Sequence, residues 1–255
     1  MNSRRVIRWE KEGVEMAFVW IPAGKFRMGS RGYSAVEEPV HEVRIERGFW
    51  LGETPVTQAQ FGLWTAAAGG EHKNGFEGRP DHPAESLDWR MAVRYCGWLT
   101  EEKGAEFPEE GLMACLPTEA EWEYACRAGT TTVFHFGDYK YESPLSDYAW
   151  WGGVIGEGNA RNEPYAHAVG GKRANAWGLY DLHGNVWEWC GDWHGEKYYG
   201  ESPLSDPSGP LTGSNRVFRG GSWGDSPKYF RSAVRGKNSP TVRFDILGFR
   251  VALIP

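Results

Sequence analysis

The sequence has few cysteines and histidines, and those present are scattered. Its 255 residues contain four cysteines (Cys96, Cys115, Cys126 and Cys190) with no Cys-x-x-C pair, and seven histidines with no pair four residues apart and no His-Glu-x-x-His motif. A disulfide framework and a catalytic zinc site are therefore not expected. Because the cysteines lie in apolar or helical stretches, we expect reduced, buried thiols.

The sequence also has no long basic run and no long apolar run. The formal net charge is −6, from 28 basic and 34 acidic residues. Nucleic-acid binding lacks its usual cluster of cations, and there is no stretch of about 18 apolar residues to span a membrane. The start, MNSRRVIRWEKEG, has no apolar core of a secretory signal. We therefore expect a cytoplasmic monomer that binds neither nucleic acid nor membranes.

Glycine, proline and aromatic residues are abundant instead. There are 34 Gly, 15 Pro, 14 Trp, 11 Tyr and 12 Phe, beside an ordinary 40% of apolar and 24% of charged residues. This composition is typical of a globular chain whose many turns are fixed by large aromatic side chains. At this length we expect a single domain, residues 1–255, of the α+β class.

Short strands are predicted near both ends of the chain. Residues 18–21 form an apolar run, and apolar residues alternate with charged ones over 24–29 and 43–45. Near the end, an apolar pair at 217–218 precedes two glycines, and the alternation over 249–253 predicts one terminal strand.

Three amphipathic helices are predicted between these strands. Thr57 is placed to cap the first, Ser86 or Asp88 the second, and Thr118 the third, in which Glu121 completes a capping box. The second helix is expected to bury a face made of Val93, Cys96, Gly97 and Leu99. Residues 130–215 show no helical periodicity, and their many aromatic residues predict packed loops.

One motif suggests a serine hydrolase. Gly220-Gly221-Ser222-Trp223-Gly224 matches the Gly-x-Ser-x-Gly elbow, but that chemistry needs a histidine after the nucleophile, and the last histidine is His194. We therefore expect the Ser222 hydroxyl to hydrogen-bond a tight turn.

The stretch 181–192 concentrates oxygen ligands. Asn185, Glu188 and the backbone around Val186 offer the hard oxygen atoms that a structural Ca²⁺ prefers. The alternative is that Asn185 and Glu188 hydrogen-bond the loop backbone while neighbouring tryptophans fill the core, and both interpretations are open. No cofactor is required by either. His183, in the same stretch, is expected to be structural, because no nucleophile can be named beside it.

Seven motifs, in this order, resemble the formylglycine-generating enzyme (sulfatase-modifying factor) family. They fall within residues 16–253 and read FVWIPAGKFRMGS (18–30), ETPVT (53–57), LPTEAEWE (116–123), NAWGLYD (175–181), GNVWEW (184–189), RGGS (219–222) and GFR (248–250). The resemblance implies a C-type-lectin-like fold with a small twisted antiparallel sheet, two or three helices and extensive ordered loops, often with bound calcium.

The resemblance does not extend to the reacting atoms. The enzymes of this family oxidise a sulfatase cysteine to formylglycine, with copper held by two cysteines in a Cys-x4-Cys arrangement after the Gly-Gly-Ser motif. Those positions fall here on Asp225 and Phe230, and no cysteine follows Cys190. Thiolates stabilise Cu(I) where oxygen ligands would not. We therefore expect no copper and no enzyme activity, with formylglycine generation or a related metal-dependent oxidation as the alternative.

The C-terminal segment, residues 220–251, resembles a different branch of the family. In the variable proteins of diversity-generating retroelements this segment is diversified and binds ligand. Here residues 219–223, 231–233, 235 and 248–251 look like scaffold, and the positions between look free. Lysine cannot arise from template asparagine codons that end in a pyrimidine, which argues against diversification at Lys228 and Lys237.

The resemblance implies a non-catalytic ligand-binding module whose partner is an unidentified macromolecule, most simply a protein. An accessory domain beside a fused or neighbouring partner is a further alternative. Aromatic and small hydrogen-bonding side chains suit such a contact surface, and we expect it to comprise Trp223, Asp225, Ser226, Lys228, Tyr229, Phe230, Val234, Lys237, Thr241, Val242, Phe244, Asp245 and Leu247. The ordinary alternative for the apolar members is that they face the core.

Overall fold

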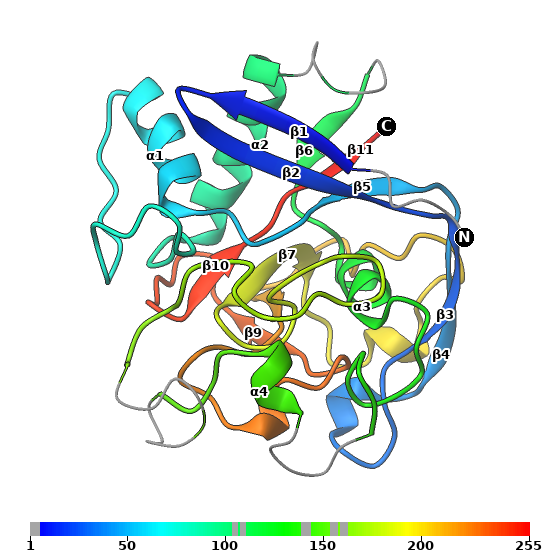
Figure 1. Ribbon diagram of the computed structural model, residues 1–255. Coiled ribbons are helices and arrows are strands. Elements are labelled where there is room, and N and C mark those ends of the chain that lie inside the picture. Colours follow the sequence, from blue (N-terminus) through cyan, green and yellow to red (C-terminus); the bar gives the residue numbers. More distant parts are fainter. Residues whose placement is uncertain (1–5, 104–106, 108–110, 139–143, 154–157, 159–162) are drawn as a thin grey trace.

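The strands of the protein form three sheets in the computed structural model, which describes residues 6–103, 107, 111–138, 144–153, 158 and 163–255 (Figure 1). The largest sheet is antiparallel and has the order β1-β2-β5-β11-β6. Its strands are β1 (Val6–Lys11), β2 (Val14–Ile21), β5 (Phe49–Gly52), β6 (Met113–Cys115) and β11 (Ala252–Ile254).

The other two sheets are smaller. One has the order β10-β7-β8-β9, with strands β7 (Trp187–Trp193), β8 (Arg216–Arg219), β9 (Gly236–Asn238) and β10 (Leu247–Phe249). The other is the hairpin of β3 (Gly24–Met28) and β4 (His41–Ile45). The strand pairs in the described residues are antiparallel, in agreement with the predicted antiparallel sheet, apart from β10, which runs parallel to β7.

The single terminal strand predicted over 249–253 is also wrong. Phe249 belongs to β10 and Leu253 to β11, which lie in different sheets. The alternation persists across the break because Phe249, Val251 and Leu253 all enter the same hydrophobic core. All residues from 247 to 253 are buried, so the alternation reports which side of the chain faces this core and not which residues are exposed.

The three predicted helices are present. α1 (Gln58–Ala67) is capped by Thr57, α3 (Glu119–Arg127) by Thr118, and both caps are completed as capping boxes. In α2 (Trp89–Lys103) the Asp88 carboxylate accepts a hydrogen bond from the backbone N–H of Met91 at 3.0 Å, so Asp88 is the cap. Shorter helical turns are α4 (Leu145–Tyr148), η1 (Ala35–Glu37), η3 (Tyr198–Gly200) and η4 (Pro227–Tyr229).

The buried face of α2 differs from the predicted one. Val93 and Gly97 are exposed, and the core-facing residues are Ala92, Tyr95, Cys96 and Leu99. Their spacing is that of one helical stripe, whereas Val93 and Gly97 lie one residue beyond it. No helix in the described residues is long and apolar enough to cross a membrane.

The region 130–215 is less irregular than expected. It contains β7 and the short helix α4 among its loops. The first four residues of β7 are all buried, so the strand shows no alternation of apolar and polar residues that would reveal it in the sequence. β7 pairs with both β8 and β10, and it lies beneath the C-terminal segment.

Candidate functional site

A network of buried ion pairs ties the C-terminal segment to helix α3. Helix α3 supplies three of its members, η1 supplies one, the C-terminal segment supplies two arginines, and the last residue of β8 supplies a third arginine. Six of the seven side chains are buried and Arg231 is half-buried. We call these residues the ion network: Glu37, Glu119, Glu123, Arg127, Arg219, Arg231 and Arg235.

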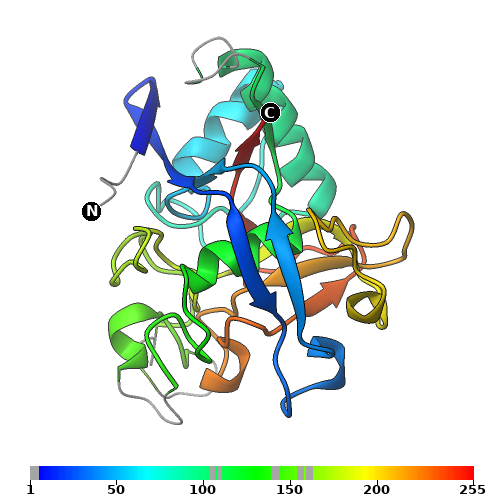
Figure 2. The same cartoon turned by 90° about the vertical axis from the view of Figure 1, so that its right-hand side faces the viewer.

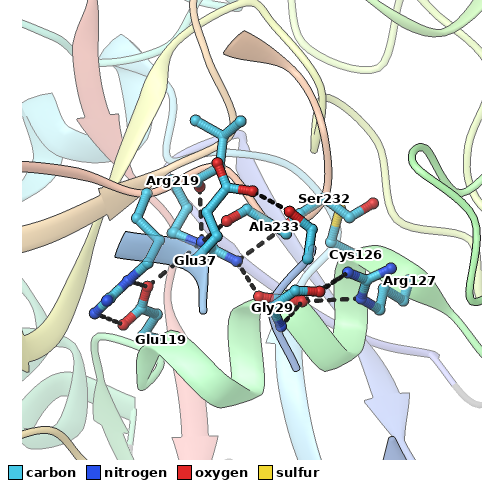
Figure 3. A network of polar contacts seen from close by, with 12 residues as sticks. Gly29, Glu37, Glu119, Cys126, Arg127, Arg219, Ser232 and Ala233 are labelled. Carbon is cyan, nitrogen blue, oxygen red and sulfur yellow. Dashed lines mark hydrogen bonds and ion pairs between the residues drawn. The ribbon is translucent and has the colours of Figure 1, made fainter. Parts of the chain in front are cut away.

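Arg219 is the centre of the ion network. Figure 3 shows it above α3, with Glu119 and Arg127 to either side. Its guanidinium donates to the Glu123 carboxylate at 2.5 Å and to the three backbone carbonyls of residues 232–234 at 2.7–2.9 Å. These hydrogen bonds and the carboxylates of Glu123 and Glu119 together offset the cost of burying this charge.

Two further ion pairs hold the same segment. Arg231 donates two hydrogen bonds to Glu37, at 2.7 and 2.8 Å, and Arg235 donates two to Glu119, at 2.6 and 2.7 Å. Burial alone would raise the pKa of Glu119, but Arg235 and Arg219 stabilise its carboxylate and the pKa is lowered. The segment is thus fixed by Arg231 and Arg235 and by Arg219 directly before it, and the resemblance marks all three positions as scaffold.

A cavity of about 930 Å³ lies against this anchored segment. On one wall are Lys228, Tyr229 and Val234 of the C-terminal segment. Much of the remaining lining comes from two other parts of the chain: Tyr33, Ser34, Val36 and Glu37 in one, and Val133, Phe134, Phe136, Asp138 and Leu145 in the other. Figure 2 shows η1, η4 and α4 gathered at the lower end of the molecule, where these walls meet. We call this the large cavity. Apolar walls with a few charged groups are typical of a binding pocket.

The structure divides the thirteen predicted contact residues by exposure. Five are exposed: Lys228, Tyr229, Lys237, Thr241 and Phe244. Four are half-buried: Asp225, Ser226, Val242 and Asp245. The remaining four are buried, which contradicts the exposure expected of a contact surface, although Val234 also lines the large cavity: Trp223, Phe230, Val234 and Leu247.

The buried four belong to different parts of the core. Leu247 and Val234 join the main core, although Val234 also lines the large cavity. Trp223 packs with Val186, and Phe230 packs with Phe134 and its neighbours. Since both ends of the segment are tied to the interior, its large apolar side chains fill the space beneath it.

Apart from Asp225, the exposed and half-buried positions form two groups and one isolated residue. Residues 226–229 lie beside the large cavity. Residues 241–245 lie against the start of α2, where the Phe244 carbonyl accepts from Ser86 N at 2.9 Å and Arg243 donates to Asp88 at 2.8 Å. Lys237 pairs with Glu196 at 2.9 Å.

Asp225, the first of the two positions expected for a copper ligand, closes a turn instead. Its carboxylate accepts hydrogen bonds from the Ser222 hydroxyl at 2.6 Å, from Ser222 N at 3.1 Å and from Trp187 Nε1 at 2.9 Å. Ser222 is fully buried, and its hydroxyl serves the turn, as predicted. The carboxylate at this position therefore has a structural role that a thiol could not fill equally well.

Phe230, at the second position, is completely buried. Its ring lies so close to Gly221, which has a φ of +78°, that a Cβ there would be 2.3 Å from the ring. Carboxylate and phenyl groups do not fit Cu(I), which prefers soft sulfur ligands. The four thiols lie outside the C-terminal segment, and burial raises the pKa of Cys115 and of Cys126 to about 12. The residues at these two positions therefore do not fit copper.

The residues considered for calcium are used within the protein. The Asn185 side chain accepts from His167 N at 2.9 Å and donates to the carbonyl of the same residue at 3.1 Å. The Glu188 carboxylate accepts two hydrogen bonds from Arg250, both at 2.6 Å, and one from Trp122 Nε1 at 2.7 Å. Asn185 thus hydrogen-bonds loop backbone, as the alternative to calcium predicts, whereas Glu188 binds the side chains of Arg250 and Trp122 and not the loop backbone. The described residues contain no cluster of three His, Cys, Asp or Glu side chains that could hold a metal.

His183 lies in an aromatic cluster. It is buried and stacks on His135, with ring centroids 4.9 Å apart, and the rings of Phe134 and Phe136 meet it edge-on. Burial lowers the pKa of His183 well below its usual range and that of His135 to about 4, so both imidazoles are neutral at pH 7. These contacts agree with a structural role.

The rest of the lining of the large cavity was not predicted from the sequence. Tyr33, Glu37, Phe134, Phe136 and Leu145 line it. The pair of phenylalanines around His135 was a signal of a packed loop, but periodicity carries no information about which distant segment the loop packs against.

Comparisons with known proteins agree with the fold and the motifs. The model of the family "Sulfatase-modifying factor enzyme 1-like domain" matches residues 5–254. The formylglycine-generating enzyme of Streptomyces coelicolor is 33% identical over 290 residues, covering 92% of this chain and 88% of the enzyme. This identity and the family match confirm the predicted family and its α+β fold.

Two solved structures are similar over nearly the whole chain. Treponema denticola variable protein 1 has a TM-score of 0.81 and 31% identity, covering 98% of this chain and 99% of that protein. PvdO from Pseudomonas aeruginosa has a TM-score of 0.79 and 28% identity, covering 94% of each chain.

Proposed function

The chain belongs to the sulfatase-modifying factor enzyme 1-like family, and we propose that it is a ligand-binding module, with a protein as its partner, that displays the C-terminal segment on the family scaffold without catalysis. The observation that carries this proposal is the division of that segment. Arg231 and Arg235 anchor it in the ion network, together with Arg219 directly before it, while residues 226–229 and 241–245 are exposed or half-buried. A diversified binding protein requires surface positions that tolerate substitution and core positions that do not.

The similarity to Treponema denticola variable protein 1 supports the same proposal. Both chains are covered almost completely, so the C-terminal segment has a counterpart there. The residues at positions 225 and 230 support binding without oxidation, because a hydrogen-bonded carboxylate and a core phenylalanine offer copper no thiolate.

Sequencing the gene in closely related isolates tests the proposal. We expect substitutions to concentrate at the exposed and half-buried positions between 223 and 247, and the ion network to stay constant. Substitutions spread evenly over the surface of the protein would contradict a dedicated binding segment.

The second candidate function is formylglycine generation, which the 33% identity to the Streptomyces coelicolor enzyme favours. The test is incubation with Cu(I), oxygen and a Cys-x-Pro-x-Arg peptide, followed by mass spectrometry for the aldehyde. We expect the peptide to remain unchanged while the Streptomyces coelicolor enzyme, run in parallel, converts it. Aldehyde formation by this protein would establish the second function.

A further inference from the structure

A second cavity, of about 300 Å³, adjoins the large cavity. The two share Tyr33, Val133, Asp138 and Arg231 in their walls. We call the second one the small cavity. Because the walls are shared, one extended ligand can occupy both cavities at once.

The cations of the small cavity are only partly neutralised. Of its four arginines, Arg127 pairs with Glu123 and Arg231 pairs with Glu37. The other two, Arg27 in β3 and Arg31 just after it, are exposed, and neither has an ion pair among the described residues.

The lining of the large cavity includes a third exposed cation. Lys228 is exposed and lies 4.8 Å from the ring of Tyr229, again without an ion pair within the described part of the chain. The opposing carboxylate in both walls is Asp138, which accepts a hydrogen bond from Val133 N at 2.7 Å. Among the described residues that line the two cavities, positive charge is thus in excess, although the whole chain has a net charge of −6. A ligand with carboxylates is complementary to it.

The large cavity supplies the apolar part of the site. Val36, Phe134, Phe136 and Leu145 line its wall. At its rim are two exposed aromatic rings: Tyr33, with 57% of its surface accessible, and Tyr229, with 40%. Rigid aromatic rings around an apolar pocket are typical of the positions where an interface gains most of its affinity.

We propose that the two cavities together bind an acidic segment of a protein partner, with a bulky apolar side chain in the large cavity and carboxylates over Arg27 and Arg31. This inference rests on the proposed function, since the C-terminal segment forms one wall of the large cavity. Arg27 and Arg31 lie outside that segment, so the preference for acidic partners is built into the constant part of the protein. Residues 226–229 then select among acidic partners.

The experiment uses the full chain and a random peptide library. Peptides are selected on the immobilised protein, and the dissociation constants of the enriched peptides are measured at low salt. The test variant is Arg27→Glu/Arg31→Glu, and the matched control is Arg90→Glu/Arg94→Glu, which makes the same charge change at two exposed positions of α2. A third variant, Tyr229→Ala, reports on the C-terminal segment.

We expect the enriched peptides to carry acidic residues beside an aromatic or large aliphatic one. Arg27→Glu/Arg31→Glu should weaken their binding at least about tenfold, and the control should change it less than about twofold. Two results would overturn the inference and leave the proposed function standing. In the first, enriched peptides bind through Tyr229 but show no acidic preference. In the second, they bind the test variant as well as they bind the parent. If no enriched peptide depends on Tyr229, the proposed function fails and the inference fails with it.

Discussion

Arg231 donates two hydrogen bonds to the carboxylate of Glu37, which lies 194 residues earlier in the chain. Only 2% of the Glu37 side chain is exposed, so the arginine is what keeps this carboxylate from being buried without a counter-ion. The pair joins η1 to the C-terminal segment and forms part of the wall of the large cavity. The shape of that cavity therefore depends on it.

Replacing this arginine should destabilise the protein strongly. We expect Arg231→Ala to lower the free energy of unfolding by about 3 kcal/mol, because it leaves a buried charge unpaired. The matched control is Arg243→Ala. Arg243 also pairs with a carboxylate, that of Asp88, but its side chain is 54% exposed, and such pairs contribute about 1 kcal/mol or less. Urea denaturation of both variants makes the comparison, and equal losses would contradict it.

The turn closed by Asp225 gives a second prediction. Asp225→Ala removes the acceptor of three hydrogen bonds, two of them from the buried Ser222, and should cost about 1–3 kcal/mol. Asp225→Asn keeps one oxygen and should cost less. Ser226→Ala, one residue along, should be neutral, because the Ser226 side chain caps nothing in η4. Thermal denaturation compares the unfolding temperatures of the three variants. An unchanged unfolding temperature for Asp225→Ala would contradict the structural role of this carboxylate.

The position of Phe230 predicts a contrast with its neighbour. Phe230→Cys should destabilise the protein by about 3–5 kcal/mol, because it leaves a cavity among Phe134, Leu145 and Trp151. Tyr229→Cys, at a side chain that is 40% exposed, should change stability by less than about 1 kcal/mol. The two variants are compared by chemical denaturation. Similar stabilities would mean that Phe230 is not a core residue.

Asp181 predicts an unusual dependence of stability on pH. Burial raises its pKa to about 6, above its value in an unfolded chain of about 4. The folded state therefore holds the proton more tightly, and the free energy of unfolding should fall as the pH rises from about 4 to about 6. Asp181 has a φ of +56°, which asparagine also tolerates.

Asp181→Asn is thus the matched variant for this effect. It cannot ionise, so its stability relative to the parent should increase by roughly 2–3 kcal/mol between pH 4 and pH 7. Urea denaturation at several pH values measures the difference. Parallel curves for the two proteins would contradict the raised pKa.

The sequence reveals the local structure of this protein better than its long-range contacts. Thr57 and Thr118 cap helices as predicted, because a capping box is encoded within four neighbouring residues. The pairing of Arg219 with Glu123 joins residues 96 apart in the sequence, and nothing local announces it. The family motifs include both residues and so pointed to a conserved architecture without giving the contact.

The candidate site shows the same contrast between what local sequence reveals and what depends on long-range contacts. Lys228 and Tyr229 are exposed beside a cavity, in line with the predicted contact role, whereas Leu247 and Phe230 are not. An apolar side chain in a loop reads the same in the sequence whether it faces a partner or the core. The buried arginines that anchor the segment determine which of its apolar side chains turn inward.

The most direct test of a diversified binding surface is a display library of the full chain. Ser226, Lys228, Tyr229, Thr241 and Phe244 are randomised together, and a second library randomises the same number of buried positions in the segment. The account predicts that members of the first library keep the unfolding temperature of the parent within a few degrees and yield binders to several unrelated proteins, while the second yields mostly unfolded chains. It would be contradicted if the first library unfolds as readily as the second, or if its folded members bind nothing.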